Sequence, residues 1–85
     1  MSRQNKNVRI SDKELELLEV INSVGPCSSD KVHESIGPKT DFLIVLRMLH
    51  ALVEKGFLQR IIINQKQLYR TSRQYSYVRS FLNNP

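Results

Sequence analysis

The hydrophobic pattern of this 85-residue chain changes its period at Gly56. Before this glycine, apolar residues recur at the three- and four-residue spacing of helices that bury one face. After it, a run rich in β-branched residues, including Ile61-Ile62-Ile63, is typical of a strand. A chain of this length is large enough for one hydrophobic core. The sequence therefore predicts a single α+β domain, mostly α, in which helices precede a hairpin.

Two helices are expected before residue 40. Ser11 and Glu14 form a capping box at the start of the first helix, which a glycine and a proline end. The second helix runs from Ser28 or Ser29 to Ile36, where another glycine and proline stop it. Their inward faces are predicted to carry Leu17, Leu18, Ile21 and Val24 in the first helix and Val32 and Ile36 in the second.

The third helix is the longest of the three. Thr40 or Asp41 caps it, and Gly56 closes it after Lys55. Its inward stripe is predicted to be Phe42, Val45, Leu46, Leu49, Leu52 and Val53. Its opposite face carries, at helical spacing, Leu43, Arg47, His50 and Glu54.

A hairpin and a short helix follow. Phe57–Ile63 and Gln67–Thr71 are the predicted strands, residues 64–66 form a polar turn, and Ser72 caps the C-terminal helix. Three helices followed by a hairpin is the layout of a winged helix-turn-helix, whose third helix lies in the major groove of double-stranded DNA. We expect residues 10–71 to form this winged-helix domain, between a flexible basic arm over residues 1–9 and a C-terminal helix over residues 72–85.

The basic residues lie mainly at the two ends of the chain, which has a net charge of +5. The first ten residues carry three bases and no acid, and residues 55–85 carry six bases and no acid. Acid-free basic segments are typical of proteins that bind a polyanion.

The chain contains the stretch Leu49-x-x-Leu52-x-x-x-Gly56-Phe57-Leu58-x-Arg60, and then Leu68-Tyr69-Arg70-Thr71. These two stretches resemble winged-helix transcription regulators of the MarR and penicillinase-repressor type. The resemblance covers roughly residues 10–75. It implies that the first stretch joins the recognition helix to the wing, and that the second leads into a dimerisation helix. It implies a small transcriptional regulator that binds double-stranded DNA sequence-specifically, and we expect a repressor. Because the chain stops at Pro85, we expect no effector pocket of the MarR type.

Two groups of residues are predicted to contact DNA. At the start and on the outer face of the third helix they are Lys39, Thr40, Leu43, Ile44, Arg47 and His50, and on the hairpin they are Arg60, Lys66 and Arg70. The alternative for the first group is a helix surface that is merely solvated. For the second group it is an edge strand whose charged side chains prevent aggregation.

Leu43 and Ile44 leave a second function open, because these positions are usually polar in recognition helices of this kind. Two adjacent exposed apolar residues also suit a winged helix that serves as a protein-interaction module in a larger transcription or replication complex. A structural or RNA-binding winged helix is a weaker alternative, because the sequence lacks a cluster of aromatic residues on which single-stranded bases could stack.

The C-terminal helix carries an apolar face that is predicted to form a homodimer interface. Its residues are Tyr75, Val78, Phe81 and Leu82. The alternative is that this helix folds back onto the core of its own protomer, close to the first helix.

We expect no enzyme, metal site or cofactor. Cys27, His33 and His50 lie outside any metal-binding spacing, and each glycine lies at a helix end rather than in a phosphate-binding loop. We expect a cytoplasmic protein with no membrane segment, because no apolar stretch is long enough to span a bilayer and the N-terminus has no secretory pattern. A redox role for Cys27 through an intermolecular disulfide stays open, and no small-molecule ligand is indicated.

Overall fold

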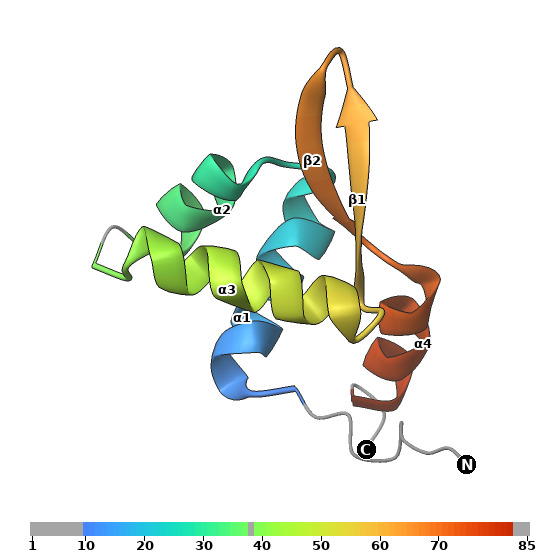
Figure 1. The fold of residues 1–85 in the computed structure, drawn as a ribbon. Helices are drawn as coiled ribbons and strands as arrows, with labels where there is room; N and C mark the ends of the chain where they lie inside the picture. The colour runs from blue at the N-terminus through green and yellow to red at the C-terminus, as the bar shows by residue number, and fades with distance from the viewer. Residues whose placement is uncertain (1–9, 38, 83–85) are drawn as a thin grey trace.

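Four helices and a two-stranded antiparallel sheet make up the part of the chain that the structure describes, as the sequence predicts. The computed structural model describes residues 10–37 and 39–82, and the side chains of these residues up to residue 80. The predicted arm over residues 1–9 therefore lies outside the described residues. The elements are α1 (Asp12–Val24), α2 (Ser29–Ile36), α3 (Phe42–Glu54), β1 (Leu58–Ile63), β2 (Lys66–Thr71) and α4 (Arg73–Leu82). The hairpin stands out from the helical body, and α4 lies beyond the C-terminal end of α3 (Figure 1).

Side-chain caps decide where the first three helices begin. The Ser11 hydroxyl accepts a hydrogen bond from the Glu14 amide at 3.1 Å, and the Ser11 amide donates to the Glu14 carboxylate at 2.9 Å, which is the predicted capping box. Of the two serines available to α2, Ser28 is the cap. Asp41 rather than Thr40 caps α3, because its carboxylate accepts from the Leu43 amide at 2.8 Å.

The hairpin turn is shorter than the sequence suggests. Only Asn64 and Gln65 form it, both with positive φ, and Lys66 already belongs to β2 opposite Ile63. Two left-handed residues give a turn whose twist matches that of the two strands. The second strand therefore begins one residue earlier than predicted. Cys27 adds a single bridge on the other edge of β2, where its amide and carbonyl bond to the backbone of Tyr69 at 3.0 and 2.8 Å.

The hydrophobic core lies where the helices, including the first turn of α4, meet the base of the hairpin. It consists of Leu17, Leu18, Ile21, Cys27, Val32, Val45, Leu49, Leu52, Phe57, Leu58, Tyr69 and Tyr75. Two parts of the predicted stripes differ from this core. Val24 is 52% exposed, because it ends α1 and lines an open groove beside α2 instead of facing the core. In α3, Phe42 and Leu46 are only half-buried at the margin of the stripe, and Met48 packs partly against the core.

Candidate nucleic-acid interface

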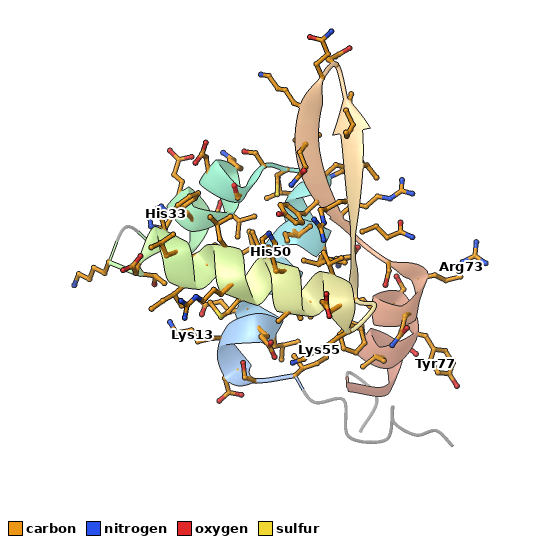
Figure 2. All side chains as sticks on the ribbon, in the orientation of Figure 1. Lys13, His33, His50, Lys55, Arg73 and Tyr77 are labelled. Carbon is orange, nitrogen blue, oxygen red and sulfur yellow. The ribbon has the colours of Figure 1, made fainter. Side chains whose placement is uncertain are left out.

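The outer face of α3 is an exposed row with a mixed apolar and basic character. Leu43 and Ile44 are 64% and 50% exposed, and Arg47 and His50 are exposed further along the same helix. Figure 2 shows His50 along α3, away from the end where the helix begins. The spacing of four and three residues places Leu43, Arg47 and His50 on one helix face. The row thus offers methyl groups at its start and hydrogen-bond donors after them.

The turn that leads into α3 is held by a residue from α2. The ring Nε2 of His33 lies 2.6 Å from the carbonyl oxygen of Thr40, and since a carbonyl only accepts, Nε2 donates the proton. The same ring meets Phe42 edge-on, with 5.5 Å between the ring centroids. Thr40 is accordingly half-buried, whereas Lys39 is exposed beside it. His33 therefore positions the start of α3, a role that its sequence context did not indicate.

The three predicted basic residues of the hairpin divide between its two faces. Paired residues of an antiparallel ladder lie on the same face, and successive residues alternate. Arg60 is paired with the buried Tyr69, whereas Lys66 and Arg70 both lie on the other face. The Nε of Arg70 donates to Gln59 directly opposite at 3.0 Å. All three bases are exposed, but only Lys66 and Arg70 can act on one surface together.

The C-terminal helix packs against its own protomer. Tyr75 is completely buried, and Val78 packs partly against the core, as expected if the helix folds back close to the first helix. The Tyr75 hydroxyl donates to the Glu19 carboxylate, which Arg79 also binds at 2.9 and 3.2 Å. Burial and the Glu19 carboxylate raise the pKa of Tyr75 to about 12. The side chains of Phe81 and Leu82 lie outside the described residues, and the homodimer stays a prediction.

The architecture is similar to that of solved winged-helix regulators. It superimposes on the Multiple Antibiotic Resistance Repressor, MarR, with a TM-score of 0.76 at 16% identity over 89% of this chain. It superimposes on a mutant of ZitR from Lactococcus lactis with a TM-score of 0.73 at 13% identity over 96% of this chain. The chain spans 56% of the length of each of these two proteins.

The penicillinase repressor family model matches residues 10–83. The chain belongs to this family. A search of the curated proteins found no significant match. The family is named for a repressor, and the chain has the winged-helix fold of the two solved structures.

Cys27, His33 and His50 lie in separate parts of the fold. Cys27 is buried in its bridge to Tyr69, and burial raises the pKa of its thiol. His33 is bonded to Thr40, and His50 is exposed on α3. Over residues 10–37 and 39–82, no group of three or more His, Cys, Asp or Glu side chains is arranged to hold a metal ion. No helix among the same residues is both long and apolar enough to cross a membrane.

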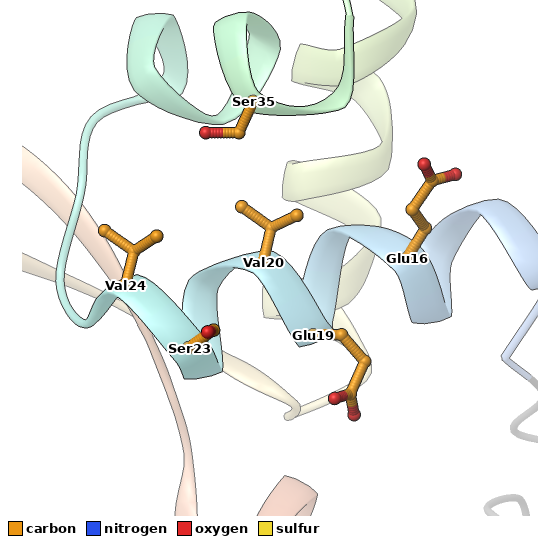
Figure 3. A pocket seen from close by; sticks show the side chains of 6 residues that line it. All are labelled: Glu16, Glu19, Val20, Ser23, Val24 and Ser35. Carbon is orange, nitrogen blue, oxygen red and sulfur yellow. The ribbon is translucent and has the colours of Figure 1, made fainter.

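An open groove of about 440 Å³ lies between α1 and α2, with a lining that differs from the α3 face. Val20 and Val24 point toward Ser35 of α2, whereas Glu19 points away toward the other side of α1 (Figure 3). Glu16 contributes a carboxylate to the lining of the groove, and none of the lining residues is a base. A phosphate backbone is not attracted to such a lining, so the groove does not extend the basic surface of α3 and the hairpin.

Proposed function

We propose that this member of the penicillinase repressor family binds double-stranded DNA in a sequence-specific manner and represses transcription by occluding its site. The observation that carries the proposal is the exposed row on α3, the second helix of the helix-turn-helix. Arg47 is a long cationic donor on this row, and a bidentate contact to a guanine edge is the commonest specific contact of such a residue. His50 lies one turn further along the same face.

Phosphate contacts come from the residues around α3. Lys39 precedes the helix, and Lys66 and Arg70 share one face of the hairpin. Such contacts add affinity and orientation and carry no base preference. Arg60 lies on the opposite face of the hairpin. It therefore contacts a different strand of the DNA or makes no DNA contact. The basic arm over residues 1–9 is proposed to add further phosphate contacts, through Arg3, Lys6 and Arg9.

The test is a salt series on duplexes selected from a random pool. If about four to six phosphates are contacted per protomer, the slope of log affinity against log salt is about −0.9 per contact. Arg47→Ala is expected to cost about 1–3 kcal/mol of binding and to relax the base preference. Lys66→Ala is expected to weaken all duplexes about equally and to flatten the slope.

The matched control is Lys13→Ala, which removes an exposed cation from α1 that pairs with Glu16 at 3.8 Å. Its duplex affinity should stay near that of the unsubstituted protein. DNA binding that neither Arg47→Ala nor Lys66→Ala weakens would reject α3 and the hairpin as the surface used.

A second candidate function is a protein-interaction module, which the 64% and 50% exposure of Leu43 and Ile44 favours. In that case Leu43→Ala and Ile44→Ala abolish capture of a protein partner, whereas Arg47→Ala is mild. All three side chains are exposed, so the substitutions should leave thermal stability near that of the unsubstituted protein. Measuring duplex affinity and unfolding on the same variants separates the two functions.

The proposal includes a homodimer. Two copies would place two recognition helices on half-sites about one helical turn apart, which is how many short regulators gain affinity and site length. The predicted contact between the two protomers is the C-terminal end of α4. The first turn of α4 is not available, because its Tyr75 is buried in the core of its own protomer.

A further inference from the structure

The first turn of α3 contains only apolar side chains. Of the four residues 42–45, Val45 is buried and Phe42 packs against His33. Leu43 and Ile44 are left pointing outward, although each branched side chain would gain free energy by leaving water. Two adjacent apolar side chains held outward on a helix face indicate a surface that a partner covers.

The charges around this pair indicate what kind of partner it is. Lys39 is exposed just before the helix, and Arg47 is exposed one turn after Leu43. The carboxylate of Asp41, the acid nearest in sequence, accepts the amide hydrogen of Leu43 as the helix cap. The pair therefore lies between two cations, which suits a polyanion that also presents apolar groups.

Duplex DNA presents such a group to a recognition helix. The N-terminal residues of this helix contact base edges in the major groove. The apolar group on those edges is the 5-methyl group of thymine. A cytosine methylated at C5 carries the same group at the same position of the pyrimidine ring.

We infer that Leu43 and Ile44 read the 5-methyl group of a pyrimidine in the major groove, an inference that rests on the proposed function. Arg47 lies about 6 Å further along the helix axis than Leu43, at about 1.5 Å per residue. Base pairs are about 3.4 Å apart. The methylated pyrimidine is thus placed within about two base pairs of the guanine that Arg47 contacts.

The test replaces each thymine of the selected duplex, one at a time, by deoxyuridine, which removes only the methyl group. Burial of one methyl group corresponds to roughly a fourfold change in affinity. The unsubstituted protein is expected to lose about three- to tenfold at one or two positions. Leu43→Ala, or Leu43→Ala combined with Ile44→Ala, is expected to bind the thymine and deoxyuridine duplexes equally.

A second arm of the experiment distinguishes the two sources of the methyl group. The sensitive A·T pair is replaced by G·C, with cytosine or 5-methylcytosine at the pyrimidine position. Tighter binding to the methylated duplex means that methylated cytosine is also a ligand. Equal binding to these two duplexes, together with weaker binding to deoxyuridine than to thymine, assigns the contact to thymine alone.

Val24→Ala is the matched control, because Val24 is a 52% exposed apolar residue on α1, outside α3. It should keep the full sensitivity to deoxyuridine, and all variants should melt at the temperature of the unsubstituted protein. Duplex binding that Arg47→Ala weakens but that no deoxyuridine changes would overturn this inference and leave the proposed function standing. Failure to bind any duplex would overturn both.

Discussion

Glu14 combines two structural tasks in one carboxylate. It accepts the Ser11 amide in the capping box of α1, and it accepts the Lys55 ammonium through both oxygens at 2.9 Å. Burial alone would raise the pKa of Glu14, but the hydrogen bonds from Ser11 and Lys55 outweigh it and hold the pKa below its ordinary value. The bridge ties the start of α1 to the residue that follows α3, across 41 positions of sequence.

Glu14→Gln is expected to lower the free energy of unfolding at neutral pH by about 1.5–3 kcal/mol, because it removes charge-assisted hydrogen bonds. A lowered folded-state pKa stabilises the fold above the unfolded pKa, and this stabilisation is lost as pH falls through the folded value. The gap between the two proteins should therefore close below about pH 4.

Chemical denaturation across this pH range makes the measurement. Glu16→Gln is the control, because Glu16 is an exposed residue whose ion pair with Lys13 spans 3.8 Å, and it should change stability by at most about 0.5 kcal/mol. A gap for Glu14→Gln that stays constant at every pH would show that the carboxylate charge is not what stabilises the fold.

The link between α2 and α3 positions the start of α3. The His33 side chain of α2 bonds to the backbone of the connecting turn, at the carbonyl oxygen of Thr40. The same ring also supports Phe42, the first residue of α3. The start of the helix that carries Leu43 and Arg47 is thus positioned by a side chain that does not itself lie on the exposed row.

His33→Ala is expected to lower the free energy of unfolding by about 1–2 kcal/mol, through a lost hydrogen bond and a lost ring contact. It should also weaken duplex binding, because the first turn of α3 is no longer held in place. Thermal unfolding and duplex titration measure the two effects. Glu34→Ala, its exposed neighbour, should alter neither by more than a small amount. Unchanged affinity for His33→Ala would mean that α3 is positioned by its core stripe alone.

At the scale of the whole molecule, α4 contributes Tyr75 to the hydrophobic core. Tyr75 is completely buried in the core, and its hydroxyl donates to the carboxylate of Glu19 in α1, so the first turn of α4 packs on its own protomer. A homodimer that uses this helix must therefore rely on its later residues, where the sequence places Leu82.

Sedimentation and thermal unfolding of two variants separate these roles. Tyr75→Ala is expected to cost about 3–5 kcal/mol of stability, as for other large aromatic truncations in cores. Leu82→Asp is expected to shift the protein from dimer toward monomer and to weaken operator binding, because a carboxylate at an apolar interface has no partner. An unchanged mass with lost stability for Leu82→Asp would instead assign this residue to the protomer core.

Local patterns in the sequence determined most of the fold. The capping box at Ser11, the change of period at Gly56 and the β-branched run before Asn64 are set by neighbouring residues, so each could be predicted with no knowledge of the rest of the chain. The exposed row of Leu43, Arg47 and His50 could be predicted for the same reason, since helical spacing alone puts these residues on one face.

Tertiary structure decided everything that depends on residues distant in sequence. The Glu14–Lys55 bridge, the Cys27–Tyr69 bridge and the packing of Tyr75 against α1 join positions 41 or more apart. No local period marks such pairs, because each arises from how whole elements meet. The division of Arg60 from Lys66 and Arg70 has a more local cause: the two-residue turn at Asn64 and Gln65 pairs Ile63 with Lys66, and this register differs by one residue from that of a three-residue turn.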